Sequence, residues 1–209
     1  MAKKKSVRRQ IIKRQNYNFI YKNFLIAVDF LKTLKNYIWF SCGLFLLTII
    51  IGYLFPIFFV TQVQNLIQEL IKETQGLNFF ELIKFIITNN MQSAFSGMIL
   101  GVFFAVVPIA ILVVNGYVLG FVANKSVSYE GFLILWRLLP HGIFEIPAII
   151  ISISLGMKLG LFLLVYKGEN KKKEFLEWIK NSLRVFILVV IPLLVIAGII
   201  EGMLIFVLG

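Results

Sequence analysis

The stretch that decides the fold of this chain runs from Phe85 to Asn124 and reads FIITNNMQSAFSGMILGVFFAVVPIAILVVNGYVLGFVAN. It contains no Asp, Glu, Lys or Arg, and residues 36–68 are equally free of charge. Uncharged runs of this kind are typical of membrane-spanning helices, because about 20 mostly apolar residues cross about 30 Å of hydrocarbon. We therefore interpret the chain as a membrane protein whose solvent is lipid.

The composition supports the same interpretation. The 209 residues are 59% hydrophobic and only 15% charged, with a mean hydropathy of +0.90, whereas soluble domains carry about 25% charged residues. A chain of this length has room for one bundle but not for a separate soluble enzyme domain. The single cysteine, Cys42, lies inside the first apolar run, so neither a disulfide framework nor a cysteine-based metal site is expected.

The net charge of +11 is concentrated before the first apolar run. The positive-inside rule therefore predicts a multi-pass protein of the plasma (cytoplasmic) membrane with a cytoplasmic N-terminus, facing an anionic inner leaflet. No nucleic-acid partner is expected, because the tail carries no motif of a known nucleic-acid-binding module. The basic residues are Lys3, Lys4, Lys5, Arg8, Arg9, Lys13, Arg14, Lys22, Lys32 and Lys35, opposed by Asp29.

The hydrophobic periodicity predicts an all-α fold, a polytopic transmembrane helix bundle with amphipathic interfacial helices. We divide the chain into a basic tail and interfacial helix over 1–37 and a bundle over 38–209. The expected elements are spanning helices over 38–61, 91–122, 143–166 and 185–208, short outer helices over 62–90 that break at Gly76, and a short amphipathic helix over 174–183.

The segment 129–139, YEGFLILWRLL, is too short to cross a bilayer and is followed by Pro140 and Gly142. We interpret it as a re-entrant half-helix that enters the membrane and turns back. This arrangement has about four spans, and it leaves the loop that contains Lys171, Lys172 and Lys173 outside, against the positive-inside rule.

A full crossing by residues 116–139 would give five spans and place that loop inside. It would also take three charged groups into hydrocarbon, at about 2.5 to 3.5 kcal/mol each on insertion-based scales. Those groups belong to Lys125, Glu130 and Arg137. The sequence leaves four or five spans as alternatives and favours four.

Glycines recur at the spacing of close helix contacts, because small residues four apart let two backbones approach. The pairs predict helix packing inside the fold or in a homo-oligomer such as a dimer. A proline precedes each of the last three pairs, which fits either close packing or a repeated helical unit of the kind found in transporters. The pairs are Gly97/Gly101, Gly116/Gly120, Gly156/Gly160 and Gly198/Gly202, and the prolines are Pro108, Pro147 and Pro192.

The segment LLPHGIFEIPAI, residues 138–149, holds the only histidine of the chain. If the helix includes His141, then His141 and Glu145 share one face at i and i+4; otherwise His141 lies in the break at Pro140 and donates to freed backbone carbonyls. Glu145 either caps the helix start through its dipole or faces water or a partner inside the membrane.

Depth arithmetic connects this segment to other polar groups. At 1.5 Å per residue, Glu145, Glu201 and Asn115 all fall within about 10 Å of the same membrane face. We therefore predict that they form an intramembrane polar cluster near the cytoplasmic face, with His141 beside it. Lys158 lies deeper, where it would pair with Glu201 or extend to the interface.

The segments LVVNGYVLG (112–120), LLPHGIFEIPAIIIS (138–152) and AGIIEGML (197–204) resemble the signature segments of the stage II sporulation protein M family of integral membrane proteins. The resemblance runs from about residue 85 to the C-terminus. It implies a multi-spanning protein without known catalysis, and its sporulating members anchor a peptidoglycan-degrading complex. The positions that carry over are Asn115, Gly116, Gly120, His141, Gly142, Glu145, Pro147 and Glu201.

Two functions follow as expectations. The first is a non-enzymatic scaffold or anchor that holds membrane or envelope proteins in the plane of the membrane. The expected form of this scaffold is a homodimer. The alternative is a small transporter or channel with an intramembrane polar site at Glu145 and Glu201. No cofactor is expected, and no metal either, because one histidine with two glutamates of unsettled spacing is a weak ligand set.

Overall fold

The computed structural model describes residues 18–103, 105–137 and 139–208, so the basic tail over 1–17 and the prediction made for it lie outside the described residues. All regular structure in the described part is helical, which confirms the all-α prediction. After a helix over residues 18–32, the elements are α2 Lys35–Leu54, α3 Val60–Thr74, α4 Phe79–Ile99, η1 Leu100–Val102, α5 Val106–Glu130, η2 Phe132–Arg137, α6 Leu139–Val165, α7 Lys171–Val185, η3 Phe186–Val190 and α8 Ile191–Leu208.

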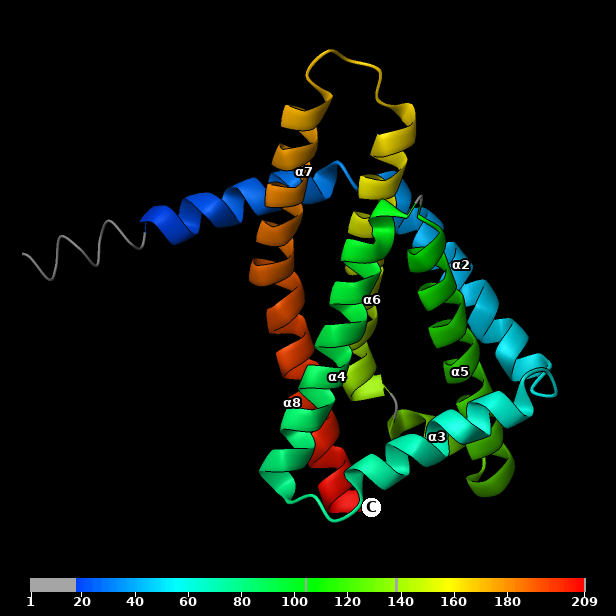
Figure 1. Ribbon diagram of the computed structural model, residues 1–209. Helices are drawn as coiled ribbons and strands as arrows, with labels where there is room; N and C mark the ends of the chain where they lie inside the picture. Colours follow the sequence, from blue (N-terminus) through cyan, green and yellow to red (C-terminus); the bar gives the residue numbers. More distant parts are fainter. Residues whose placement is uncertain (1–17, 104, 138, 209) are drawn as a thin grey trace, which may run out of the picture.

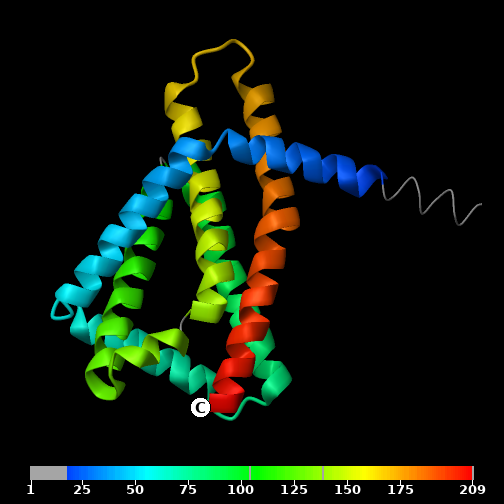
Figure 2. The same ribbon diagram turned by 180° about the vertical axis from the view of Figure 1, so that it is seen from behind.

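The helices form a tapered bundle with α6 in the middle. Figures 1 and 2 show α2 and α5 on one side of α6 and α4 and α8 on the other, with α3 crossing one end of the bundle. The helix over 18–32 lies across the other end, where the loop between α6 and α7 also projects. Helices α2, α5, α6 and the continuous α7–α8 are long and apolar enough to cross a membrane.

The expected helix over 91–122 is in fact two antiparallel helices, α4 and α5. Helix α4 ends in the 3-10 turn η1, and Ala105 takes a left-handed conformation with φ of 63° before α5 begins. Pro108 therefore lies in the first turn of α5 rather than at a kink, a position that suits proline because the first turn needs no backbone donors. The short outer helix expected before residue 90 is the first half of α4, which begins at a capping box formed by Asn78 and Glu81.

This turn changes the topology. Because α4 supplies an additional pass along the bundle, the loop before Lys171 returns to the end at which α2 begins (Figure 1). That places Lys171, Lys172 and Lys173 at the end of the bundle where the helix over 18–32 lies, the arrangement that the positive-inside rule favours. The additional pass comes from α4 and not from residues 116–139. In place of the half-helix expected over 129–139, the chain has the end of α5, Gly131 with φ of 82°, and η2.

Two other helix boundaries differ from expectation. The first spanning helix ends at Leu54 instead of residue 61, because Pro56 cannot donate a backbone hydrogen bond and Phe59 takes a left-handed conformation with φ of 58°. The amphipathic helix expected over 174–183 is α7, which passes through the π-helical turn η3 directly into α8.

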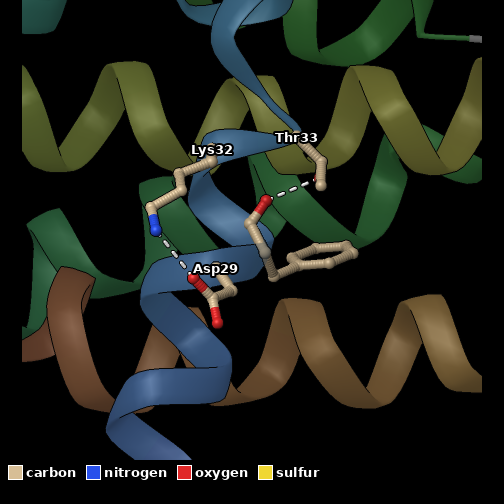
Figure 3. Close-up of polar contacts among 4 residues, drawn as sticks. Asp29, Lys32 and Thr33 are labelled. Carbon is tan, nitrogen blue, oxygen red and sulfur yellow. Dashed lines mark hydrogen bonds and ion pairs between the residues drawn. The ribbon is translucent and has the colours of Figure 1, made fainter.

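The last turns of the N-terminal interfacial helix are held by local bonds and pack against the bundle. Thr33 Oγ1 donates to the Phe30 carbonyl at 2.6 Å and Lys32 pairs with Asp29 at 2.8 Å (Figure 3). Ala27, Phe30 and Leu34 are buried and pack in one core cluster with α4, α6 and α8. The helix therefore lies across the bundle with one face attached to it.

Helix α6 is the core of the molecule. Every residue from Ala148 to Gly160 is buried except Ile151. Its polar residues bond to neighbouring helices: Ser152 Oγ donates to the Ala94 carbonyl of α4 at 2.5 Å, and Ser154 Oγ lies 3.3 Å from Ser41 Oγ of α2. In lipid such bonds and close packing hold helices together, because the hydrocarbon offers no competing partners.

The paired glycines line the seams between helices of the same chain. A Cβ added at Gly160 would meet the Gly101 carbonyl and would lie 2.5 Å from Ala105 N, and one at Gly156 would meet the Gly97 carbonyl. The other two pairs lie at helix contacts that do not involve α6. Gly116 and Gly120 of α5 pack on α2, at Thr48, Ile49 and Tyr53. Gly198 and Gly202 of α8 pack on α4, at Ile87 and Ile83.

Candidate intramembrane site

The site begins at the first turn of α6. The helix starts at Leu139, so Pro140 and Gly142 lie inside its first turn and do not form a backbone break. Proline is tolerated there because the first backbone donors of a helix have no partner inside it. His141 and Glu145 are therefore one helical turn apart on one face, the first of the two arrangements that the sequence allowed.

Glu201 reaches the same place from α8. Helix α8 ends at the end of the bundle where α6 begins (Figures 1 and 2), so a residue near the end of α8 meets one near the start of α6. His141, Glu145 and Glu201 each offer one nitrogen or oxygen ligand atom, and these atoms all lie within 4.8 Å of one another. All three side chains are half-buried. We call these three residues the His-Glu-Glu cluster.

The cluster carries two carboxyl groups and no basic partner among the described residues. The ion pairs found there are Lys32 with Asp29 and Arg137 with Glu130, and neither involves Glu145 or Glu201. Two negative charges within 4.8 Å of each other repel by at least about 3.5 kcal/mol at an effective dielectric of about 20. Burial between helices adds a desolvation cost. The cluster is therefore costly in its fully ionised form and favours the uptake of a proton or another cation.

His141 is incomplete as well. Its Nδ1 atom is buried and has no hydrogen-bond partner among the described residues. A buried polar atom without a partner costs about 1 to 3 kcal/mol. The imidazole thus has an unused donor or acceptor position next to two acidic side chains.

Asn115 is not joined to the cluster by any bond of the described residues. Its amide nitrogen donates to the Ile111 carbonyl of its own helix at 2.8 Å, and the neighbouring Gly116 packs on α2. The prediction treated Asn115 as part of a single helix over 91–122, whereas the chain turns within that segment and Asn115 belongs to α5. The same turn places the His-Glu-Glu cluster at the end of the bundle opposite the N-terminal helix, away from the face predicted to be cytoplasmic.

Pro147 and Gly142, predicted at a backbone break or a helix contact, occupy neither kind of position. Helix α6 continues through Pro147, which is exposed. A Cβ at Gly142 would meet only Ile146 of the same helix, at 3.6 Å, so Gly142 marks no helix contact. The chain can keep Pro147 helical because the neighbouring residues of α6 pack against α2, α4 and α5.

Lys158 is engaged far from Glu201. Its side chain is buried, its Nζ donates to Thr33 Oγ1, and the same nitrogen lies 4.5 Å from the ring centroids of Phe30 and Trp178. Aromatic faces attract a cation through their quadrupole. No local sequence pattern indicates these contacts, because Phe30, Trp178 and Lys158 come from three separate segments. Lys158 is therefore unavailable to neutralise the His-Glu-Glu cluster.

Two surface hollows of about 420 and 360 Å³ lie elsewhere. The first is lined by residues of the loop before α7 and of α7 itself, among them Glu169 and Lys173, and the second by residues of α3. Neither is lined by the cluster. What the cluster itself can do is hold a positively charged group between α6 and α8, with one nitrogen and two carboxylates as ligands.

The comparisons with known proteins agree with this architecture. The family model described as Stage II sporulation protein M matches residues 41–204. Two uncharacterized proteins of the archaeon Methanocaldococcus jannaschii are 37% identical over 137 residues and 34% identical over 119 residues. These alignments cover 64% and 56% of this chain and 60% and 66% of the two relatives, so the chain spans less than two thirds of either relative's length. No solved structure was found to match the chain.

The family model spans most of the chain, including α6 with His141 and Glu145 and α8 with Glu201. The four long apolar helices agree with a family of membrane proteins. The chain therefore belongs to the stage II sporulation protein M family.

Proposed function

We propose that this protein is a small cation transporter or channel that takes a cation into the membrane at the His-Glu-Glu cluster. The observation that carries the proposal is the meeting of Glu145 and Glu201, from two helices, without a basic side chain to neutralise them. Acidic groups inside membrane-spanning helices are costly and commonly mark ion pathways. A cation between them would supply the missing charge.

The position of the cluster suits entry from one side. Glu145 lies six residues after the start of α6, about 9 Å along the helix, and α6 itself, at about 40 Å, exceeds the hydrocarbon thickness. The cluster is therefore close to one interface, within reach of water. The lysines at the start of α7 and in the N-terminal helix lie in segments at the other end (Figure 1). With this basic end in the cytoplasm of the cell, on the anionic leaflet of the plasma membrane, the cluster faces outward.

A second function, that of a non-enzymatic scaffold, is favoured by the apolar surface of α2. Trp39, Leu46 and Leu54 are each more than half exposed, while the glycine seams are used within the chain. An apolar face of this kind suits lipid, a second copy of the chain, or a membrane or envelope protein. As a scaffold the protein would hold such partners in the membrane and carry out no reaction of its own.

Flux through liposomes separates the two functions. Purified protein is reconstituted, and the decay of imposed proton, sodium, potassium and divalent-metal gradients is followed with ion-sensitive dyes. We expect at least one gradient to decay faster than in empty vesicles and Glu145→Gln and Glu201→Gln to abolish the effect. Glu73→Gln on the exposed surface of α3 is the matched control and should behave as the wild type.

Wild-type vesicles that hold every gradient as well as empty ones would rule out transport. The scaffold would then be tested by cross-linking in membranes, with the size of the complex measured before and after Leu46→Ala on the exposed face of α2.

A further inference from the structure

We infer that the His-Glu-Glu cluster is a binding site for a divalent transition-metal cation, with His141, Glu145 and Glu201 as its protein ligands. This inference rests on the proposed function only in using the same site, because equilibrium binding of a metal requires no transport. It goes further by naming the chemical class of the cation.

The donor set is the first argument. An imidazole nitrogen and two carboxylate oxygens suit zinc and its first-row neighbours, whereas calcium and magnesium are bound by oxygen ligands and usually by six or more of them. His141 and Glu145 are separated by one helical turn, the spacing at which two side chains of one helix can hold the same metal ion. Glu201 from α8 supplies the third ligand from across the helix interface.

The distances are the second argument. The three ligand atoms lie within 4.8 Å of one another, whereas tetrahedral ligands with bonds of about 2.0 to 2.1 Å lie about 3.4 Å apart. Side-chain rotation alone can close a difference of this size. Three protein ligands leave a fourth tetrahedral position open, and an open position allows a metal to exchange its ligands and leave.

Charge and the unpartnered nitrogen are the third argument. A divalent ion balances the two carboxylates, and no ion pair of the described residues joins a lysine or arginine to them. Lys158 donates to Thr33, and Arg137 lies 3.7 Å from Glu130 through Nη1 while its buried Nε has no partner among the described residues. The buried Nδ1 of His141 has no partner among the described residues. Coordination through Nδ1 would satisfy that atom directly.

The test is metal binding by the purified full-length protein in detergent, with any affinity tag removed. His141 is the only histidine of the chain, so histidine-dependent binding reports on this site. The probes are Co²⁺, followed by its visible absorption spectrum, and Zn²⁺ added in competition. We expect one ion per chain and a rise in the melting temperature on adding Zn²⁺.

His141→Gln, Glu145→Gln and Glu201→Gln should each weaken binding at least about 100-fold, since even the loss of an outer-shell partner costs about 10- to 100-fold. Glu73→Gln and Cys42→Ser should bind as the wild type, which excludes surface carboxylates and the thiol. Glu201→His keeps a metal ligand and should retain binding. This variant separates the loss of a ligand from the loss of the fold, as does the helical circular dichroism of each variant without metal.

Absence of Co²⁺ and Zn²⁺ binding by the folded wild-type protein would overturn the inference, as would binding that the three ligand substitutions leave unchanged. Flux of protons or monovalent ions without metal binding would overturn the inference but support the proposed transport. Metal binding without any flux would support the inference and count against transport.

Discussion

Replacing Gly160 by alanine should destabilise the bundle, although alanine is the better helix former. The added Cβ would lie 2.5 Å from Ala105 N and would also meet the Gly101 carbonyl, both backbone atoms of the turn between α4 and α5. Ordinary contact begins at 3.4 Å, so the two backbones must part by at least about 0.9 Å at this point, and further at the closer Gly101 carbonyl. Overpacking of this kind costs about 1 to 3 kcal/mol, which exceeds the gain of up to about 1 kcal/mol from helix propensity.

Gly43→Ala is the matched control. Gly43 is also inside a membrane-spanning helix, α2, but a Cβ there would meet nothing within 4 Å. Only the propensity effect then remains, and Gly43→Ala should leave the protein unchanged or slightly more stable.

Thermal unfolding in detergent, followed by circular dichroism, measures the difference. After the gain of about 1 kcal/mol is subtracted, the net loss is up to about 2 kcal/mol. At about 2 to 4 °C per kcal/mol, Gly160→Ala should lower the melting temperature by up to about 8 °C, and Gly43→Ala should not lower it. The particle mass from light scattering should stay the same for both variants, because the seam lies within one chain. Equal melting temperatures for the two variants, or dissociation of an oligomer by Gly160→Ala alone, would refute the reasoning.

Two further predictions concern the arrangement of the chain. Lys158→Met should detach the N-terminal helix, because the ammonium group bonds Thr33 and lies over the Phe30 ring; trypsin should then cut between residues 18 and 35 faster than in the wild type, and equal cutting would contradict this. In a Cys42→Ser background, a cysteine at position 72 on α3 should react with an impermeant maleimide on intact cells, and one at position 172 should react only after permeabilisation. Labelling of both from one side would contradict the fold.

The sequence predicted the helical fold and several boundaries because lipid makes uncharged runs easy to recognise. The break at Gly76 and the helix α7 were predicted from signals that also serve in soluble proteins. These signals are a glycine at a helix end and an amphipathic periodicity at a water interface. The turn between α4 and α5 was missed because it carries no polar residues. Ala105 and Gly101 pack against α6, so this turn is apolar. Its sequence therefore cannot be distinguished from that of a continuous apolar helix.

The sequence predicted the site residues whose placement did not depend on the turn between α4 and α5. Glu145 and Glu201 were matched by counting residues from helix ends that the sequence located well, and the structure brings them together. Asn115 was placed by counting along a helix that does not exist as predicted. Its place in the cluster therefore stays a prediction. The Lys158 site has no local pattern at all, because its aromatic partners come from distant segments.

The turn between α4 and α5 also determines at which end of the bundle each group of charged residues lies. With the additional pass of α4, the start of α7 and the N-terminal helix share one end of the bundle (Figure 1). The start of α6 and the end of α8, which carry Glu145 and Glu201, lie toward the other end. If the basic end is cytoplasmic, a membrane potential that is negative inside draws cations from the carboxylate end toward the basic end. The driving force is about 2.3 kcal/mol per charge and 100 mV, twice that for a divalent ion. The basic end opposes a cation that has arrived there, so release to the cytoplasm requires that the lysines lie beside the path and not in it.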